Sequence, residues 1–383
     1  MKSVRFGDLC KLQNGRAFKP EEWSEAGTPI VRIQNLNDET KPFNYCAFDV
    51  EKRFWIDSGD LLFSWSGTPG TSFGAFFWNR GKGFLNQHIF RVDINEKLVD
   101  RKYLRYALNS LILKIIDQAH GGVGLKHITK AKLEEVQIPL PSLEEQCRIA
   151  SILDKADELR QKRQQAIEKL DQLLQATFID MFGDPVSNPK GWEIGCIGDM
   201  LESVKYGSSD KATLEGEIPI LRMNNLTYSG EMNLTDLKYI TKVQADEKYL
   251  VKEGDILFNR TNSKELVGKT AVYVGPEPMA YAGYLVRGRT KANFAPEYIS
   301  AFLNSPWGKE KLQSMCKSIV GMANINAKEF QSIVLPIPPE DLQIQFKNKI
   351  LAIRKKKQLL VNQLNVLETL FNALQNQAFS GTL

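Results

Sequence analysis

The sequence predicts an α+β protein: two strand-rich mixed α/β domains, related by pseudo-two-fold symmetry and separated by two long antiparallel coiled-coil helices. Several short segments occur twice in the same order, and each copy is followed by a long helix-forming stretch. Within each copy, short β-branched and aromatic runs lie between glycine, proline and asparagine breaks. With 383 residues, the chain is long enough for two or three domains, each with its own core.

The repeat is clearest in four segments. They are residues 28–36 (TPIVRIQNL), which return as 218–226 (IPILRMNNL), 59–63 (GDLLF) as 254–258 (GDILF), 108–110 (LNS) as 303–305, and 136–141 (VQIPLP) as 333–338 (IVLPIP). The order is kept and the separation drifts by only a few residues, as loop insertions would cause. Two copies of one unit on a single chain form a pseudo-dimer, and two copies with different surfaces suit a target with two different halves.

The repeat divides the chain into four predicted parts. They are a first globular domain (residues 1–142), a first long helix (143–182), a second globular domain (183–339) and a second long helix (340–383). Strands are expected at residues 74–78 and 270–275. Short helices are expected at 103–116 and 296–317, where apolar residues recur every three or four positions.

Both long helices carry start signals. Ser142 and Glu145 form a capping-box pattern after a pair of prolines, and Gly183 marks the end of the first helix. The second helix follows two prolines and has Glu340 and Asp341 in its first turn, where acidic side chains favour the positive end of the helix dipole.

Each long helix also has an apolar stripe. In the second helix, steps of four and three residues connect Phe346, Ile350, Ile353, Lys357, Leu360, Leu364, Leu367, Phe371 and Leu374. The first helix has a looser stripe, with Ile149, Leu153, Ala156, Ile167, Leu170 and Leu174. The nearest cover for either stripe is the other helix, and about 40 residues give a rod of roughly 60 Å. The alternative is a pair of core helices inside one domain.

Composition limits the class of protein. A formal net charge of +5 permits a nucleic-acid partner but does not demand one. The cysteines are scattered, odd in number and never spaced as C-x-x-C, which argues for a reducing compartment and against a disulfide framework or a zinc site. No apolar stretch resembles a signal peptide or a membrane span, so the expected location is cytoplasmic. The cysteines are Cys10, Cys46, Cys147, Cys196 and Cys316.

Further motifs accompany the repeat. They are residues 124–128 (GLKHI), 138–146 (IPLPSLEEQ) and the GDLLF segment in the first copy, and residues 321–325 (GMANI) and 337–343 (IPPEDLQ) in the second. Together these motifs resemble those of a known family, the specificity (S) subunits of type I restriction-modification systems. Each motif alone is weak, but the ordered and doubled set covers almost the whole chain.

One further motif occurs in a single copy. Residues 86–88 of the first copy read Asn-Gln-His, whereas residues 281–284 (YAGY) stand at the corresponding place in the second.

The resemblance implies a non-catalytic DNA reader. Each globular domain would be a target-recognition domain for one half of an asymmetric, bipartite site, and the helices would set the gap between the halves. Two modification subunits would methylate the N6 atom of an adenine in each half-site with S-adenosylmethionine. Restriction subunits, two in the fullest assembly, would use ATP and Mg²⁺ to translocate and cut DNA. No cofactor, metal or membrane is expected on this chain itself.

The first group of candidate DNA contacts lies at matching strand ends. Arginine can pair two hydrogen bonds with guanine, and asparagine or glutamine can do so with adenine. The alternative is that these side chains satisfy backbone groups in a turn. The candidates are Arg32, Gln34 and Asn35 with their counterparts Arg222, Asn224 and Asn225.

A second group lies in loops, where recognition residues commonly sit on a rigid scaffold. The loops after the GDLLF and GDILF strands differ in sequence, as two different half-sites would require; the alternative is a solvated hairpin tip. A glycine-rich tip at residues 121–127, and its counterpart at 321–326, could bind phosphate through backbone amides or could simply make a turn. The candidates are Ser64, Trp65, Ser66, Asn86, Gln87, His88, Lys126 and His127, and in the second copy Asn259, Arg260, Thr261, Asn262, Lys264, Asn324 and Asn326.

A basic run on the second long helix, residues 354–357, is either a solvated face or a contact with the DNA backbone. His120 and His127 have no carboxylate or cysteine arranged around them, so no metal site is expected there.

Two other functions remain open. One is a stand-alone nuclease or methyltransferase, against which the absence of an Asn-Pro-Pro-Tyr or Asp-Pro-Pro-Tyr motif counts. The other is a protein-docking scaffold, because the apolar share of the helices would also serve a partner protein.

Overall fold

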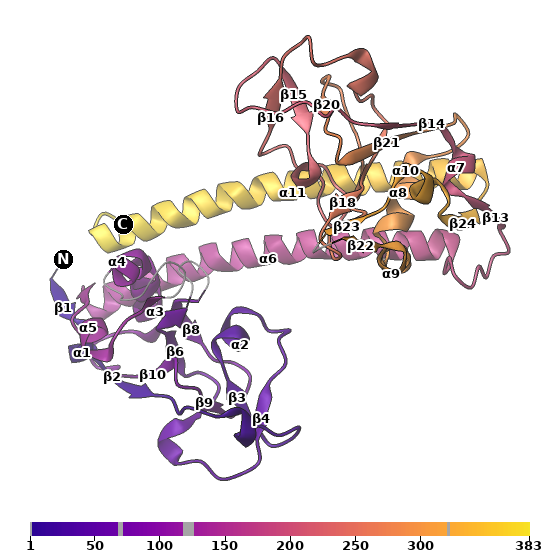
Figure 1. Cartoon of the computed structure of the whole chain (residues 1–383). Coiled ribbons are helices and arrows are strands. Elements are labelled where there is room, and N and C mark those ends of the chain that lie inside the picture. The colour runs from indigo at the N-terminus through magenta and orange to yellow at the C-terminus, as the bar shows by residue number, and fades with distance from the viewer. Residues whose placement is uncertain (1, 68–71, 118–125, 320–321) are drawn as a thin grey trace. The chain divides into compact units, whose positions relative to one another are not determined.

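The computed structural model describes residues 2–67, 72–117, 126–319 and 322–383, which form two compact units (Figure 1). Unit 1 comprises Met1–Arg163 and Gln363–Leu383, and unit 2 comprises Gln164–Asn362. The contacts therefore divide the chain differently from the predicted four parts. Each unit contains one globular domain together with half of each long helix.

Unit 1 contains twelve of the described strands. They are β1 (Ser3–Arg5), β2 (Cys10–Asn14), β3 (Thr28–Val31), β4 (Asn44–Cys46), β5 (Trp55–Ile56), β6 (Leu61–Ser64), β7 (Ser66–Gly67), β8 (Gly74–Phe77), β9 (Gly83–Leu85), β10 (Ile89–Ile94), β11 (Lys126–His127) and β12 (Gln137–Pro139). Its short helices are α1 (Phe6–Leu9), α2 (Ile33–Asn37), α3 (Arg101–Ser110), α4 (Ile112–Asp117) and α5 (Lys130–Glu134), with 3₁₀ turns at Pro20–Glu22 and Lys52–Phe54.

Unit 2 repeats this inventory. Its strands are β13 (Glu193–Cys196), β14 (Leu201–Tyr206), β15 (Ile218–Leu221), β16 (Lys238–Ile240), β17 (Ile256–Asn259), β18 (Thr261–Asn262), β19 (Thr270–Val272), β20 (Ala280–Tyr281), β21 (Leu285–Thr290), β22 (Lys317–Ile319), β23 (Met322–Asn324) and β24 (Val334–Ile337). Its short helices are α7 (Ile197–Met200), α8 (Pro296–Asn304), α9 (Pro306–Met315) and α10 (Ala327–Gln331), with 3₁₀ turns at Met223–Asn225 and Glu247–Tyr249. The long helices are α6 (Leu143–Phe182) and α11 (Glu340–Ser380).

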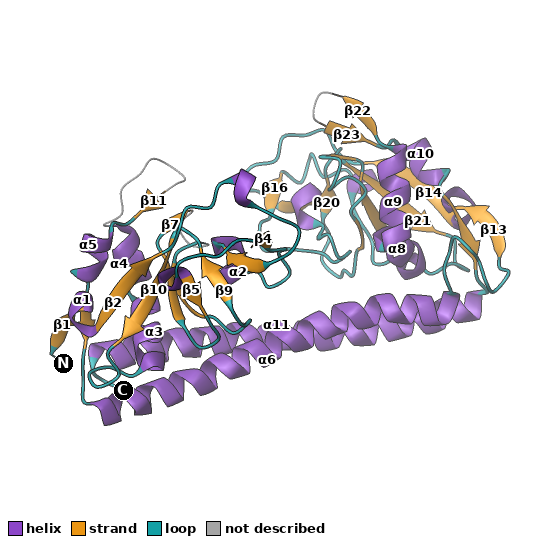
Figure 2. Cartoon of the chain, turned by 90° about the horizontal axis from the view of Figure 1, so that it is seen from below, coloured by secondary structure: helices purple, strands orange, loops and turns teal. Residues whose placement is uncertain are grey.

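Both units combine strands with short helices (Figure 2), and they share the strand order of the main sheet. The main antiparallel sheet has the order β2-β10-β6-β8 in unit 1 and β14-β21-β17-β19 in unit 2. A second sheet contains one parallel pair in each unit, β3 with β9 and β15 with β20. A two-stranded ribbon, β1 with β12 or β13 with β24, leads into the long helix that follows. The duplication predicted from the sequence is thus a duplication of hydrogen-bonded strands.

Matching side-chain hydrogen bonds place the two units in register with each other. Tyr103 donates its hydroxyl proton to the carbonyl oxygen of Pro139 at 2.7 Å, and Tyr298 donates to Pro336 at 2.6 Å. At the start of each long helix, the buried side chain of Gln146 or Gln343 accepts a backbone N–H bond across the domain. These paired bonds define which residues of the two units correspond.

The short helices differ from the sequence prediction, because each predicted helix is broken in two. In unit 2, Ser305 is extended (φ −68°, ψ 161°) and accepts a hydrogen bond from the N–H of Gly308, so it ends α8 and caps α9. Pro306 explains the break, because proline disfavours a helical conformation in the residue before it. In unit 1 the break falls at Leu111.

The long helices begin as the start signals predict, and they pair antiparallel within each unit. In unit 1, Ile149 and Leu153 near the start of α6 share a core with Phe371 and Ala378 near the end of α11. In unit 2, the ring centroid of Phe182 near the end of α6 lies 5.0 Å from that of Phe346 near the start of α11. The same residues also belong to the domain cores, but each long helix is shared between the two units and does not lie inside one domain.

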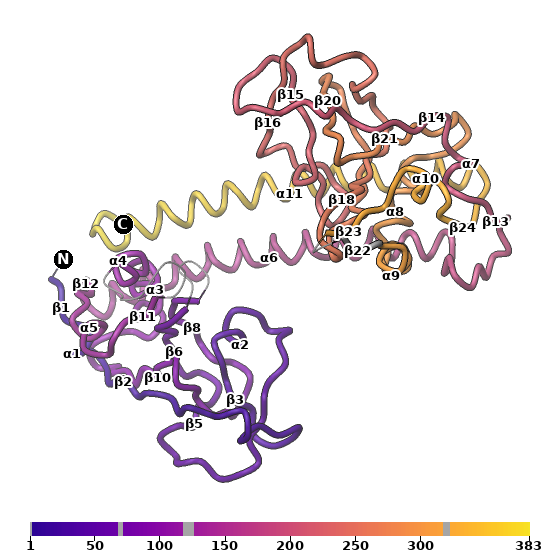
Figure 3. Tube along the Cα trace, viewed as in Figure 1, coloured from indigo at the N-terminus to yellow at the C-terminus, as the bar shows by residue number. Residues whose placement is uncertain are grey.

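Both chain ends lie in unit 1 (Figure 3). The N–H of Leu140 donates to the carbonyl oxygen of Lys2, and Arg148 Nη2 donates to the carbonyl oxygen of Leu383 at 2.7 Å. Within the described part of the chain, no helix has the length and apolar character that crossing a membrane requires.

Candidate nucleic-acid interface

One backbone arrangement occurs in both units where the central strand of the main sheet ends. In unit 1, the residue after β6 is Trp65; its N–H donates to the carbonyl oxygen of His88 (3.2 Å), and its carbonyl oxygen accepts from Ile128 N–H (3.1 Å). In unit 2, Arg260 makes the same two bonds, to Tyr284 (3.0 Å) and from Ile325 (2.9 Å). We call this place the strand junction. It joins three loop segments that are far apart in the sequence.

A glycine permits the close approach of a fourth segment at each junction. A Cβ atom on Gly15 would lie 2.0 Å from the carbonyl oxygen of Asn86, and one on Gly207 would lie 2.3 Å from that of Ala282. Any side chain at these positions would force the backbones apart, so the glycines shape the junction.

In unit 1, aromatic and imidazole side chains surround the junction. The Trp65 ring stacks on Phe90 with 5.5 Å between centroids, and it meets the His88 ring edge-on at 5.2 Å. Gln87 Nε2 lies 3.1 Å from His88 Nε2, and His127 pairs with Ser66 across β11 and β7. Burial, and then the nearby His127, lower the pKa of His88. His88 is therefore neutral at pH 7 and can both donate and accept a hydrogen bond.

In unit 2, an arginine occupies the same backbone position. Arg260 Nε donates to the carbonyl oxygen of Gly283 at 3.1 Å, and its guanidinium lies over the Tyr206 ring at 5.1 Å. Tyr206 is itself held, because its hydroxyl oxygen accepts from Ala327 N–H at 3.0 Å. Among the described residues, only the Nε of the Arg260 guanidinium has a hydrogen-bond partner, and the two terminal nitrogens have none. A supported guanidinium with both terminal nitrogens available suits bidentate recognition of guanine or phosphate.

Four predicted contact residues are buried and need correction. Asn35 and Asn225 are at most 1% exposed, and each accepts a hydrogen bond from the backbone of the preceding arginine, Arg32 or Arg222. Their amide nitrogens donate to carbonyl oxygens of the following loop. The turn-forming alternative describes them, and a side chain without exposed surface cannot reach a base.

The other two buried candidates are Ser64 and Asn259, the last residues of β6 and β17, each 0% exposed. They lie directly before the junction residues, so they support the junction rather than line it.

The remaining strand-end candidates are partly exposed but engaged. Arg32 lies over the Trp23 ring at 5.3 Å, and Gln34 Nε2 donates to the carbonyl oxygen of Pro42 at 3.4 Å. In unit 2, Asp236 accepts from both Arg222 Nη2 (3.0 Å) and Asn224 Nδ2 (2.6 Å). The carboxylate of Asp236 offsets the charge of Arg222, whereas Arg32 lies over an uncharged ring, so the two copies differ in charge at this place.

The loop candidates divide into supporting and available side chains. Asn326 caps α10 by accepting from two backbone N–H groups, which is a structural role. Lys264 is exposed. Other candidates are bonded to residues elsewhere in the chain: Lys126 to the carbonyl oxygen of Ile116, Asn262 to Met223, Thr261 to Asn324, and the backbone N–H of Asn86 to Val31. His120, residues 121–125 and Gly321 lie outside the described residues.

Two residues at the junction of unit 2 were not among the predicted contacts. Tyr284 is 51% exposed and occupies the position of His88, and Tyr206 supports Arg260. The repeat placed Tyr284 in the segment opposite the Asn-Gln-His motif, but the change of residue type kept it off the list of candidates. No sequence signal pointed to Tyr206, because its contact with Arg260 connects strands far apart in the chain.

The basic run on α11 is not a uniform DNA-facing surface. Lys357 is buried and forms ion pairs with Asp171 (2.5 Å) and Glu231 (2.8 Å). Only Lys355 and Lys356 of the run are fully exposed. Lys357, the polar position in the apolar stripe of α11, therefore connects α11 to α6 and to the globular domain of unit 2.

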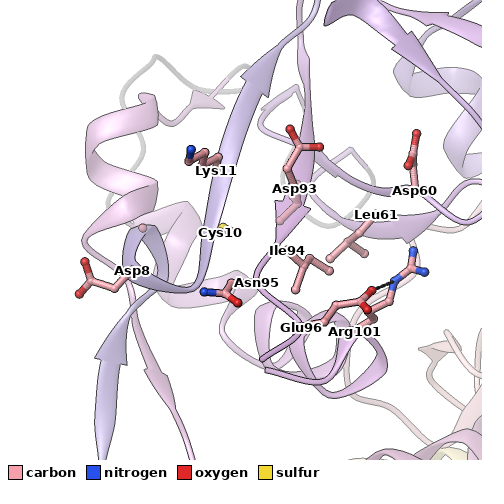
Figure 4. Close-up of a pocket in the computed structure, with 12 residues that line it drawn as sticks. Asp8, Cys10, Lys11, Asp60, Leu61, Asp93, Ile94, Asn95, Glu96 and Arg101 are labelled. Atoms are coloured by element: carbon pink, nitrogen blue, oxygen red, sulfur yellow. Dashed lines mark ion pairs between the residues drawn. The ribbon is translucent and has the colours of Figure 1, made fainter. Parts of the chain in front are cut away.

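A large cavity of unit 1 lies at the opposite end of the main sheet from the junction (Figure 4). It has a volume of about 720 Å³ and is lined near Leu61, where β6 begins. Four acids line it, Asp8, Asp60, Asp93 and Glu96, against two bases, and Glu96 pairs with Arg101 at 3.6 Å. Such a lining repels phosphate, so this cavity is no part of a DNA surface. No group of three His, Cys, Asp or Glu residues suited to a metal occurs in the described ranges.

The family model for the type I restriction modification DNA specificity domain matches residues 1–169 and 189–369. The chain is 22% identical over 387 residues to the type I restriction enzyme EcoBI specificity subunit of Escherichia coli, covering 91% of this chain and 78% of the relative. It is 24% identical to the EcoKI specificity subunit of Escherichia coli strain K12, covering 75% and 67%.

Solved structures share the fold. The S subunit of the type I restriction-modification system from M. genitalium aligns with a TM-score of 0.62 at 15% identity, covering 99% of this chain and 96% of that one. A chain from a study of complex assembly and conformational transition of the type I R-M system aligns with a TM-score of 0.53 at 18% identity. The duplicated domains, the long helices and the family match over both copies agree: the chain belongs to the type I restriction-modification DNA specificity family, as a specificity subunit.

Proposed function

We propose that the chain reads an asymmetric, bipartite DNA site, with one half read at the strand junction of each unit. The observation that carries this proposal is the junction itself. The backbone hydrogen bonds are the same in both units, whereas the side chains at equivalent positions differ: Trp65 against Arg260, and His88 against Tyr284. A conserved frame with exchanged side chains is what two different half-sites require, because base edges are read by side chains.

The two junctions would read DNA by different means. In unit 2, the terminal nitrogens of Arg260 would pair with guanine or with a phosphate, and Tyr284 would contact the sugar or a base edge. In unit 1, the neutral His88, with Gln87 beside it, would donate to and accept from one base pair. Exposed lysines such as Lys264 would add phosphate contacts, which make binding fall steeply with salt.

We further propose that the chain performs no chemistry itself and positions other subunits. Its relatives are named as specificity subunits, which supports this reading. Modification subunits, two per chain, would bind S-adenosylmethionine and methylate adenine N6 in each half-site. Restriction subunits would bring ATP and Mg²⁺ chemistry.

Methylome sequencing tests the proposal. Cells carrying the chain with its modification subunit should show a split, adenine-methylated motif with two different halves. A continuous motif, or no motif that depends on the chain, would refute it. Nuclease or methyltransferase activity of the isolated chain with Mg²⁺ or S-adenosylmethionine would favour the stand-alone enzyme. Partner binding without any sequence preference in DNA binding would favour the docking scaffold.

A further inference from the structure

Unit 2 contains a cavity of about 440 Å³ that the DNA-reading proposal does not use. It lies among α6, α8, α9, α11 and the loop at Tyr228. Its wall is largely apolar, formed by Leu174, Phe178, Ile179, Ala301, Trp307 and Ile350. At its edge, Tyr228 is 53% and Ile179 is 37% exposed. An apolar cavity with an exposed aromatic edge is typical of a binding site.

Two charged side chains in the lining are incompletely bonded. Glu297 is 4% exposed, and its Oε2 has no hydrogen-bond partner among the described residues; Oε1 lies 4.0 Å from Lys347 Nζ. Arg354 Nε likewise has no partner in the described chain, although its Nη2 donates to the carbonyl oxygen of Gly230 at 3.3 Å. Both unbonded atoms are themselves buried, so they are exceptions to the rule that buried polar groups are hydrogen-bonded.

The corresponding place in unit 1 is occupied by the chain's own side chains. The paired tyrosine bonds, Tyr103 with Pro139 and Tyr298 with Pro336, set the correspondence between α3 and α8. It follows that Tyr106 stands where unit 2 has Ala301, and that Arg105 stands where it has Ser300. Unit 2 thus lacks both large side chains at this place.

Tyr106 and Arg105 are firmly held in unit 1. The Tyr106 hydroxyl donates to Asp154 Oδ1 at 2.8 Å, and its ring lies 6.1 Å from that of Phe371. The Arg105 guanidinium lies over the Tyr106 ring at 4.3 Å and 3.6 Å from Asp157. The hollow that remains has a volume of about 300 Å³, and its lining contains five charged residues: Lys102, Arg105, Asp154, Asp157 and Glu158.

The charge on the long helix is also reversed between the units. The glutamine bonds at the helix starts, Gln146 in α6 and Gln343 in α11, set the second correspondence. By this register, Asp157 of α6 corresponds to Arg354 of α11. Unit 1 therefore pairs the acidic Asp157 of its long helix with Arg105, whereas in unit 2 the charges of Glu231 and Glu297 lie close enough to act on the basic Arg354.

We propose that the cavity of unit 2 is a socket for one large apolar or aromatic side chain from a partner polypeptide. Its wall is largely apolar, as burial of such a side chain requires. The space left by Ala301 takes a side chain of the size that Tyr106 has in unit 1. The charged lining residues are Asp171, Glu297 and Arg354, so the cavity offers no excess of positive charge to phosphate.

This inference rests on the proposed function in one respect, since it takes the partner to be a modification subunit. It also predicts that the two units differ in how they bind a partner. Unit 2 would receive a side chain that unit 1 supplies from its own sequence, so two identical partners would bind the two units with different affinities.

A filling variant tests the socket in the full chain. Ala301→Tyr places in unit 2 the side chain that unit 1 carries at the same position. Calorimetric titration with the purified modification subunit should show a dissociation constant at least about tenfold larger at one of the two sites, and no change at the other. Gln313→Tyr, at an exposed position of α9, is the matched control and should bind as the unaltered chain does. Sequence-dependent binding to DNA, measured without partner, should be unchanged in both variants.

Thiol protection gives a second measurement that does not depend on filling the cavity. In Ala301→Cys, alkylation by iodoacetamide should slow at least about tenfold when the modification subunit is bound, whereas Gln313→Cys should react at its free rate. Equal affinity of Ala301→Tyr and the unaltered chain, or an unprotected cysteine at 301, would overturn the socket. Weakened DNA binding by Ala301→Tyr alone would overturn it as well. Absence of any binding between the unaltered chain and the modification subunit would instead overturn the proposed function.

Discussion

Arg260 Nε donates a hydrogen bond to the carbonyl oxygen of Gly283 at 3.1 Å, which ties the end of one strand to the turn before another. Because the guanidinium is also supported by the Tyr206 ring, its position is fixed by the protein itself. Pre-organisation of this kind reduces the entropy lost on binding a ligand. Unit 1 has Trp65 at the same position, so the two junctions offer different chemical groups.

Replacing Arg260 by alanine should impair recognition of one half-site only. If the side chain pairs with a base, we expect a loss of roughly 1 to 3 kcal/mol that is specific to one position of the motif. Binding should be measured by titration against DNAs that carry substitutions in each half. Lys264→Ala is the control, because an exposed phosphate contact should weaken all sequences alike and lower the salt slope by about 1. Equal losses in both halves for Arg260→Ala would contradict one unit per half-site.

Acid should destabilise unit 1 through His88. Burial, and then His127, lower its pKa below the ordinary value of 6.5. Below that value the unfolded chain binds more protons than the folded chain, so stability falls as the pH falls. Hydrogen exchange of the β10 amides at pH 7.5 and pH 5.5 should show this loss. His88→Gln should reduce the difference between the two pH values; a difference of unchanged size would argue against His88 as its source.

Alkali should stabilise unit 2 through Lys309. This side chain is 8% exposed; burial, and then the charge of Lys269, lower its pKa from 10.5 to about 8. Between pH 8 and 10.5 the unfolded chain binds the extra proton, so stability should rise with pH over this window. Lys309→Met removes the titrating amine, and urea unfolding of this variant should show a flatter pH profile. Lys311→Met, at an exposed position, is the control and should have the same pH profile as the unaltered chain.

Lys357 should matter for stability and not for DNA affinity. Its replacement by leucine would complete the apolar seam but leave Asp171 and Glu231 without their partner. We expect a loss of about 1 to 3 kcal/mol in the free energy of unfolding, less than for a fully buried pair because both acids are partly exposed. Combining it with Asp171→Asn and Glu231→Gln should recover part of this loss. A weaker DNA affinity at unchanged stability would restore the backbone-contact reading.

Local signals were sufficient for much of the fold. The capping residues and prolines near Ser142 and Gly183 act within one turn of the helix, so α6 could be delimited without knowledge of its surroundings. The heptad of α11 likewise predicted which face is covered, because Phe346, Ile350 and Phe371 are buried in the structure. Because the same motifs recur in the same order, the sequence also predicted that the two units would have similar folds.

The candidate site was less predictable. Asn35 and Arg260 are both polar residues at strand ends, yet one is buried in its own turn and the other lies at the junction. Which of these happens depends on the loop that arrives from elsewhere in the chain, and its carbonyl oxygens are not visible in the local sequence.

By itself, the sequence determined the duplication, the long helices and the family, because these depend on periodicity and short-range capping. Only the tertiary structure decided that Trp65 and Arg260 make the same two backbone hydrogen bonds, that Lys357 is neutralised, and that Ala301 lines a cavity of about 440 Å³ where Tyr106 leaves a hollow of about 300 Å³. Those outcomes depend on contacts between residues far apart in the chain, where the volume and charge of each side chain are matched or left unmatched by its neighbours.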